Sequence, residues 1–137
     1  MRKENKKVNR FFLNFTYALF LALGFQLITY LMPTQFVYLN TRLIFGTLES
    51  ATISIVLLSL AALISIYFLI ITTKSRRLIT FLLAGLISNL FDRIFRGGVI
   101  DYIYIHGFPM FNIPDIAIVV TITLLAISGL NKLKSAD

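Results

Sequence analysis

Four long apolar stretches, separated by short polar or basic segments, dominate the chain. The first covers residues 11–32 and closes at Pro33, and the others cover about 51–73, 78–95 and 113–131. The hydrocarbon core of a bilayer, about 30 Å thick, needs roughly 20 apolar residues in a helix. The pattern therefore predicts four transmembrane helices.

Two of the connections between these stretches have a different pattern. Segments 35–45 and 99–106 are rich in aromatic and β-branched residues, partly in alternation, which predicts short strands. Backbone near lipid must find hydrogen-bond partners, so we expect these strands to pair with each other over the helix ends. The predicted fold class is an all-α membrane protein with four transmembrane helices and a small extracytoplasmic β-sheet cap, forming one domain over residues 1–137.

Composition agrees with a lipid environment. Of the 137 residues, 58% are hydrophobic and the mean hydropathy is +0.85, whereas soluble domains have an apolar fraction of about 45–50%. A cleaved signal peptide would show an apolar core of about 7–15 residues and a small-residue cleavage site. Neither feature precedes Pro33, so we expect a retained helix. With no cysteine in the chain, disulfides and thiolate chemistry are excluded.

The net charge of +7 indicates membrane orientation rather than nucleic-acid binding, because the basic residues lie in short blocks between apolar stretches. Five fall in the first ten residues, three in segment 74–77 and two near the C-terminus. Only Arg42, Arg93 and Arg96 fall on the other side. Both termini are therefore predicted to be cytoplasmic, and the two strand-containing connections to face outward.

Three of the six acidic residues fall in the termini or in a loop, where a solvated carboxylate needs no explanation. The other three, Asp92, Asp101 and Asp115, fall within segment 85–115, at one predicted membrane face. A charged group at the centre of a membrane helix costs roughly 2.5–3.5 kcal/mol, and less at the rim. Their grouping indicates a functional site.

Asp101 is the hardest of these to explain structurally. It interrupts the apolar, strand-like segment 99–103, and Gly97 and Gly98 precede it. Glycine gives the backbone freedom to turn this carboxylate back toward the helix ends.

Asp115 has a structural alternative. Asn112 can cap a helix, Pro114 fits its first turn and Asp115 then stands at the third position. A carboxylate there favours the helix dipole, and for Asp115 alone this explanation is the stronger one. If Asp101 and Asp115 converge in a water-poor site, however, one keeps its proton while the other ionises, which is the chemistry of aspartyl proteases.

Asn89, Asp92 and Arg93 are spaced i, i+3, i+4 and so share one helical face. Asp92 can also form a helix-end ion pair with Arg96, and this structural role is the alternative to a functional one. Arg93 is more suggestive, because a guanidinium beside a groove can hold peptide carbonyls.

Three motifs in this segment resemble those of the lipoprotein signal peptidases (signal peptidase II). That family has Asn-x-x-Asp-Arg, Gly-Val-Val-Asp-Phe and Phe-Asn-x-Ala-Asp motifs in this order. This chain reads Asn-Leu-Phe-Asp-Arg at 89–93, Gly-Val-Ile-Asp-Tyr at 98–102 and Phe-Asn-Ile-Pro-Asp at 111–115. The resemblance covers about 30 residues well and the first half of the chain weakly.

The resemblance implies an aspartic endopeptidase that cleaves the signal peptide of prolipoproteins before the lipid-modified cysteine. Asp101 and Asp115 would be the catalytic pair. The site-shaping residues would be Asn40, Asn89, Asp92, Arg93 and Asn112. It implies no metal and no organic cofactor, a substrate that enters from the lipid with its diacylglyceryl group, and a multi-pass protein of the bacterial cytoplasmic membrane with its site at the outer face. We expect a monomer that binds no nucleic acid.

Departures from the family fall in the first half. Where the family has an Asp-Gln-x-Thr-Lys-like stretch, this chain lacks both charges, with Phe25 and Thr29 at their positions, and Arg42 replaces a glycine after Asn40. One alternative is therefore a catalytically altered, peptidase-like protein that binds lipidated or helical membrane partners. Another is a transport or scaffold subunit, although transport would place charges near the midplane of several helices.

Two further features have simple explanations. His106 is the only histidine, and one histidine without cysteines or nearby acids makes a poor metal site. The aromatic residues of the same connection are predicted to form an interfacial belt: Tyr102, Tyr104, Phe108 and Phe111.

Overall fold

The computed structural model describes residues 2–41, 51–72 and 75–134. Four helices account for most of them: α1 (Arg2–Leu31), α2 (Ala51–Ile71), α3 (Arg76–Arg96) and α4 (Ile113–Lys134). A short 3₁₀ helix, η1 (Thr34–Phe36), and two strands, β1 (Tyr38–Asn40) and β2 (Val99–Asp101), occupy the connections.

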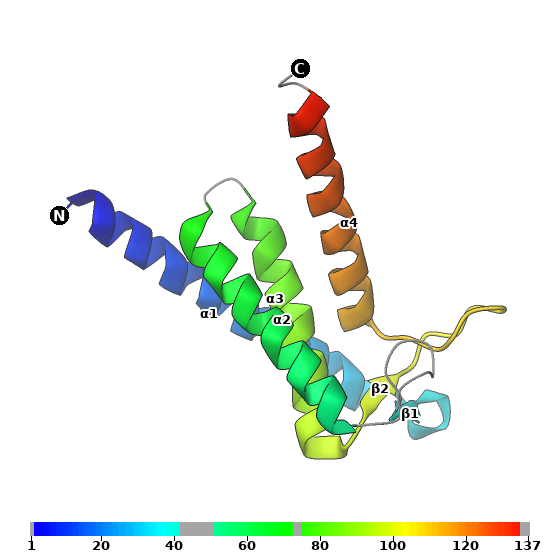
Figure 1. Ribbon diagram of the computed structural model, residues 1–137. Helices are drawn as coiled ribbons and strands as arrows, with labels where there is room; N and C mark the ends of the chain where they lie inside the picture. Colours follow the sequence, from blue (N-terminus) through cyan, green and yellow to red (C-terminus); the bar gives the residue numbers. More distant parts are fainter. Residues whose placement is uncertain (1, 42–50, 73–74, 135–137) are drawn as a thin grey trace.

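Helix α3 is the centre of the bundle, because it packs against α1, α2 and α4. The start of α1 and the end of α4 both lie on the side of the bundle away from the two strands (Figure 1). The strands lie beside the other end of α3 and below the start of α4. Every segment that carries a predicted site residue therefore reaches the same end of the molecule.

Helix α1 begins at Arg2 instead of near residue 11, so the basic N-terminal segment is helical. Lys, Arg and Glu are good helix formers, and neither glycine nor proline occurs in this segment to interrupt the helix. Pro33 follows the end of α1 and lies outside any helix, as expected for a residue that cannot continue one.

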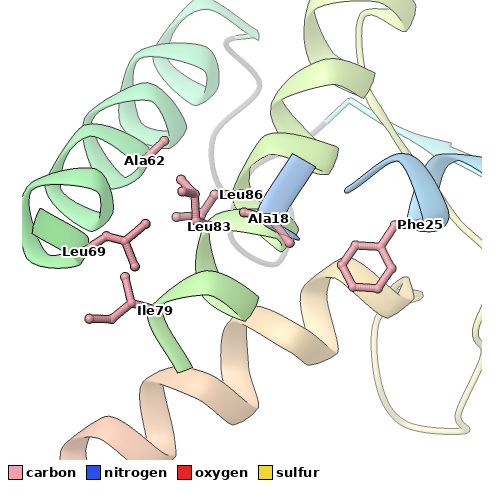
Figure 2. Close-up of a cluster of buried hydrophobic side chains, with 8 residues drawn as sticks. Ala18, Phe25, Ala62, Leu69, Ile79, Leu83 and Leu86 are labelled. Carbon is pink, nitrogen blue, oxygen red and sulfur yellow. The ribbon is translucent and has the colours of Figure 1, made fainter. Parts of the chain in front are cut away.

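The buried core is small and joins three helices (Figure 2). It contains Ala18 and Phe25 from α1, Ala62 and Leu69 from α2, and Ile79, Leu83, Ala84 and Leu86 from α3. Many large apolar side chains on α1, α2 and α4 are instead exposed, such as Phe20 at 69% and Val119 at 63%. Apolar faces of this extent indicate a lipid-facing surface.

Gly85 allows α4 to approach α3 closely. A Cβ at this position would lie 2.8 Å from the Pro114 carbonyl oxygen and 2.9 Å from Cγ1 of Ile118. Both neighbours belong to α4, so a hydrogen atom in place of a side chain sets the distance between the two helices beside the predicted site.

The two strands pair as predicted. β1 and β2 are antiparallel, with Tyr38 opposite Asp101 and Asn40 opposite Val99. Gly97 ends α3 with φ of 74°, a left-handed conformation that glycine adopts without strain. A Cβ on Gly98 would lie 2.9 Å from the Asn40 carbonyl oxygen, so the close approach of β1 also requires glycine.

The predicted strands were too long. Residues 35–36 lie in η1 just after Pro33, and residues 104–106 are not in a strand. The chain instead reverses at Gly107, with φ of 84°, so that Ile103 forms an isolated bridge with Phe111. This reversal is needed because the chain must return to the bundle to begin α4. Residues 42–45 of the predicted first strand lie outside the described part.

The predicted fold class, an all-α membrane protein with four helices and a small sheet, is confirmed. Within the described residues, three helical segments are long and apolar enough to cross a membrane: Glu4–Leu31, Thr52–Ile71 and Arg76–Arg96. α4 contains a shorter apolar segment, Ile113–Gly129, inside a helix of 22 residues. The single-domain organisation and the extracytoplasmic position of the sheet stay predictions.

Candidate functional site

A cavity of about 980 Å³ lies where α2, α3 and α4 meet the strands. Its wall is mostly apolar, with side chains such as Leu57, Leu86 and Val119. The charged and amide residues in its lining are Asn40, Asn89, Arg93, Asp101 and Asp115. Five of the seven predicted site residues therefore line the same cavity.

Asp101 is the last residue of β2 and is 1% exposed. Both of its carboxyl oxygens receive hydrogen bonds from amide side chains. Asn40 Nδ2 donates to Oδ2 at 2.8 Å, and Asn112 Nδ2 donates to Oδ1 at 3.1 Å. The carboxyl group is thus held in one orientation by two neutral donors.

Burial raises the pKa of Asp101 from 3.8 to about 7, since the charged form loses hydration. The hydrogen bond from Asn40 and the positive charge of Arg93 lower this pKa, whereas the negative charges of Asp115 and Asp92 raise it further. At neutral pH the carboxyl of Asp101 can therefore hold or release a proton.

Asp115 stands at the third position of α4, as predicted. Its backbone N–H donates to Oδ1 of Asn112 at 2.8 Å, and the Asn112 N–H donates to Oδ2 of Asp115 at 3.3 Å. This is the reciprocal arrangement of a capping box. The other oxygen, Oδ1, accepts a hydrogen bond of 2.7 Å from Asn89 Nδ2. Capping and a role in the site are therefore compatible for this carboxyl.

Asn112 connects the two carboxyl groups. While its Oδ1 caps α4, its Nδ2 lies 3.1 Å from Oδ1 of Asp101 and 3.3 Å from Oδ1 of Asn89. Asn89 in turn donates to Asp115. The side chains of α3, β2 and α4 thus form one amide network around Asp101 and Asp115, and Asn112 itself is 1% exposed.

Arg93 lies one helical turn after Asn89 and lines the same cavity at 6% exposure. Asp101 and Asp115 line this cavity as well, and the positive charge of Arg93 lowers the pKa of Asp101. This is the environment in which a guanidinium can neutralise negative charge or bind a carbonyl oxygen.

Asp92 faces a different neighbourhood and does not line the cavity. Its Oδ1 forms an ion pair with Arg96, as the i, i+4 spacing predicted, and accepts a hydrogen bond of 2.9 Å from Gln26 Nε2. Its Oδ2 accepts from the Ile100 N–H at 3.3 Å. Of the three residues predicted on one helical face, Asn89 and Arg93 line the cavity, whereas Asp92 contacts α1 and β2.

Sequence reasoning missed two contributors. Gln26 was not singled out as a site residue, but it contacts both Ser88 and Asp92. A lone amide in an apolar helix was the available signal. Tyr102 was assigned to an aromatic belt, yet its hydroxyl accepts a hydrogen bond of 3.3 Å from the Ile113 N–H at the start of α4.

The remaining residues of the outer connection differ in position. Phe108 and Phe111 line the cavity, while Tyr104 and His106 are exposed. Within the part of the chain that the structure describes, no group of three or more histidine or acidic side chains could hold a metal ion.

The arrangement can support acid–base chemistry on a peptide in an apolar cavity. Two carboxyls from different elements face one space, neutral amides orient them, and the pKa of Asp101 lies near neutrality. A pair of this kind can take a proton from water and give one to a carbonyl oxygen.

Fold and site together define a helical membrane protein with two carboxyl groups facing one apolar cavity. The family model for signal peptidase (SPase) II matches residues 6–131, and the chain belongs to this family. The resemblance predicted from the three motifs is confirmed. Because the family is one of membrane aspartic peptidases, the prediction of an aspartic endopeptidase is also confirmed.

Individual relatives agree with this membership. A lipoprotein signal peptidase of Clostridium novyi is 37% identical over 104 residues, which cover 68% of this chain and 70% of that protein. One from Pseudomonas putida is 43% identical over 60 residues, or 40% of this chain and 35% of that protein.

A solved structure of a bacterial membrane enzyme has the same fold. It matches with a TM-score of 0.78 at 21% identity, over 90% of this chain and 91% of its own. At this identity the match supports the fold, while the roles of individual residues stay predictions.

Proposed function

We propose that this protein cleaves the signal peptide of lipid-modified prolipoproteins, with Asp101 and Asp115 activating a water molecule. The observation that carries the proposal is that these two carboxyls, from β2 and α4, line one apolar cavity and share an amide network through Asn112. Membership of the signal peptidase II family supports the substrate class.

In the proposed reaction, one ionised carboxylate takes a proton from water while the water oxygen adds to the scissile carbonyl carbon. The other, protonated carboxyl gives its proton to the carbonyl oxygen. When the tetrahedral intermediate collapses, the C–N bond breaks and the leaving amine takes a proton from the carboxyl that is now protonated. One hydroxyl of the intermediate returns its proton to the carboxylate that is now ionised, which forms the product carbonyl and restores the starting state of the pair. The two carboxyls are best treated as one titrating unit.

Neutral amides suit this role because they orient the carboxyls without fixing their charge. Asn40 and Asn112 hold Asp101, and Asn89 holds Asp115. Arg93 lies in the same cavity, where it can bind a carbonyl oxygen of the peptide. Asp92 has a supporting role outside the cavity.

The substrate is expected to enter laterally from the lipid. The cavity presents apolar side chains from both α2 and α4, such as Leu57, Leu58 and Val119. These surfaces suit an apolar signal helix and a diacylglyceryl group, which both reside in the bilayer before cleavage.

The distribution of basic residues supports cytoplasmic termini and a site at the outer face of the bacterial cytoplasmic membrane. The strands that carry Asn40 and Asp101 lie at the opposite end of the bundle from the start of α1 and the end of α4 (Figure 1), which agrees with this orientation. All the residues named in the site belong to one chain, and we expect a monomer forming a single membrane domain.

The first-helix departures from the family are compatible with activity. Phe25 packs in the core, and Thr29 Oγ1 donates to the Phe25 carbonyl at 3.0 Å. Both residues are uncharged, so the loss of the family's acid and lysine together leaves no unpaired charge. Arg42 lies outside the described residues.

The test is cleavage of a lipidated lipobox peptide by the purified protein in detergent micelles, followed by mass spectrometry. We expect a single cut before the lipid-modified cysteine, and no cut in the same peptide with an unmodified cysteine. Failure of the parent to cleave would overturn the proposal. Binding without cleavage would support the peptidase-like binding protein instead.

A further inference from the structure

A second polar cluster lies between α1 and α3, outside the cavity. Gln26 Nε2 donates to the Ser88 carbonyl and hydroxyl oxygens, both at 3.0 Å, and to Asp92 Oδ1 at 2.9 Å. Gln26 Oε1 accepts from Arg96 Nη1 at 2.8 Å, and the same Nη1 pairs with Asp92. Gln26, Asp92 and Arg96 therefore form a closed ring of hydrogen bonds, which we name the Gln26 ring.

The Gln26 ring has one connection to the candidate active site. Asp92 Oδ1 is used inside the ring, while Oδ2 accepts from the Ile100 N–H at 3.3 Å. The Ile100 carbonyl oxygen lies 3.4 Å from Asn112 Nδ2. Both the N–H and the carbonyl oxygen of Ile100, the residue before Asp101, are therefore hydrogen-bonded to side chains.

These contacts matter because β2 is only three residues long. A short strand with one partner has few ladder hydrogen bonds to define its register, and a one-residue slip would turn Asp101 to the opposite face. The bond from the Ile100 N–H to Asp92 opposes such a slip. Asp92 must therefore itself be held in place.

Asp92 is 2% exposed, so its position depends on its partners. Arg96 supplies the compensating charge and is 30% exposed, so water can compete for its hydrogen bonds. Gln26 uses both ends of its amide, one on Asp92 and one on Arg96, and so restrains both partners from α1.

We propose that Gln26 and Arg96 are positioning residues, which hold Asp92, and through the Ile100 N–H hold Asp101, in its reactive orientation. The inference rests on the proposed role of Asp101. Neither residue touches the cavity, so their effect should fall on the rate of chemistry and not on substrate binding.

The first test replaces Gln26 by leucine, which has a similar volume and no polar atoms. We expect kcat to fall by about tenfold to a hundredfold, as misplacement of a reacting group by about 1 Å does, with KM changed less than about twofold. Hydrogen exchange at the Ile100 amide should accelerate. Thr29→Val is the matched control, because Thr29 lies about one turn further along α1 and its hydroxyl donates to the Phe25 carbonyl of the same helix.

The second test separates position from charge at residue 96. Arg96→Lys keeps the charge and a donor, so it should recover most of the kcat lost in Arg96→Gln. If Arg96→Lys has a kcat as low as that of Arg96→Gln, the proposed role of the Gln26 ring is contradicted.

The outcomes distinguish this inference from the proposed function. If the parent cleaves the peptide and Gln26→Leu keeps both its kcat and its Ile100 exchange rate, the positioning role is wrong and the proposed function stands. If the parent does not cleave, the proposed function fails, and unchanged Ile100 exchange in Gln26→Leu would then overturn the ring separately. A loss of kcat in Thr29→Val equal to that in Gln26→Leu would also overturn it, since general loosening of α1 would explain both.

Discussion

The carboxyl groups on the two sides of α3 have different partners. Toward α1, Asp92 is paired with the guanidinium of Arg96 and lies outside the cavity. Toward α4, Asp101 and Asp115 line the cavity and receive their hydrogen bonds from the amides of asparagines. All three acids come from one segment of the chain, so their surroundings make the difference.

The difference lies in the partners. Arg96 holds Asp92 through a direct ion pair, which is a structural contact. An amide orients a carboxyl while contributing no charge, so burial can raise the pKa, as it does for Asp101. The α1 side is therefore suited to structure and the α4 side to proton transfer. Four predictions test this contrast, in order of decreasing effect.

The largest effect is expected from removing either proposed catalytic carboxyl. Asp101→Asn and Asp115→Asn should each lower the cleavage rate of the lipidated peptide by about a hundredfold to ten-thousandfold, because general acid–base catalysis contributes that much. Asp92→Asn should retain measurable cleavage, since Asp92 does not line the cavity. Single-turnover assays compare the three. If Asp101→Asn cleaves the peptide at the rate of the parent, the distinction between the two sides of α3 is wrong.

The next effect is a pH dependence of stability. The folded pKa of Asp101, about 7, lies above its ordinary value of 3.8. Between about pH 4 and pH 7 the folded state therefore holds a proton that the unfolded state has lost, and this contribution to stability falls as pH rises through the window. Unfolding of the parent and of Asp101→Asn in mixed micelles across this range should show a steeper decline in the parent. Parallel curves would contradict the raised pKa.

A third prediction concerns the approach of α4 to α3. In Gly85→Ala the new Cβ would lie 2.8 Å from the Pro114 carbonyl oxygen, so α4 must move away and the free energy of unfolding should fall by about 1–3 kcal/mol. Gly24→Ala in α1 is the control, because nothing lies within 4 Å of its Cβ. It should be neutral or stabilising by up to about 1 kcal/mol. Equal losses in both variants would argue against close helix approach as the cause.

The smallest effect on stability should come from substitutions of Asn112. Two variants at this position separate its role as the cap of α4 from its role as a donor to Asp101. Asn112→Ala should cost about 0.5–2 kcal/mol, the value of a helix N-cap. Asn112→Ser should keep most of that stability, since serine is an equally good cap, but its shorter side chain loses the donor to Asp101. Unfolding and cleavage assays on both variants measure the two roles. Full activity in Asn112→Ser would remove Asn112 from the site.

Parts of this organisation could be predicted from residue order alone. The four apolar stretches correspond to the four helices, because the need for internal hydrogen bonding in lipid leaves helices as the simplest spanning element. The start of α4 at Ile113 followed from Asn112, Pro114 and Asp115, whose local geometry involves only neighbouring residues. The pairing of Asp92 with Arg96 was likewise local.

Other features depend on contacts between distant segments. The strand predictions were too long because propensity cannot show where the chain must reverse, as it does at Gly107. Gln26 was overlooked because its partners, Ser88 and Asp92, are more than 60 positions away. Its helical position alone gives no information about them.

By itself, the sequence determined that this is a membrane protein with four apolar helices, and its three motifs indicated the signal peptidase II family. Both depend on patterns within short stretches of chain. Only the tertiary structure decided that Asp101 and Asp115 share one cavity while Asp92 faces α1. That division depends on the packing of α1 and α4 on opposite sides of α3 and on the hydrogen-bond partners that this packing brings to each carboxyl.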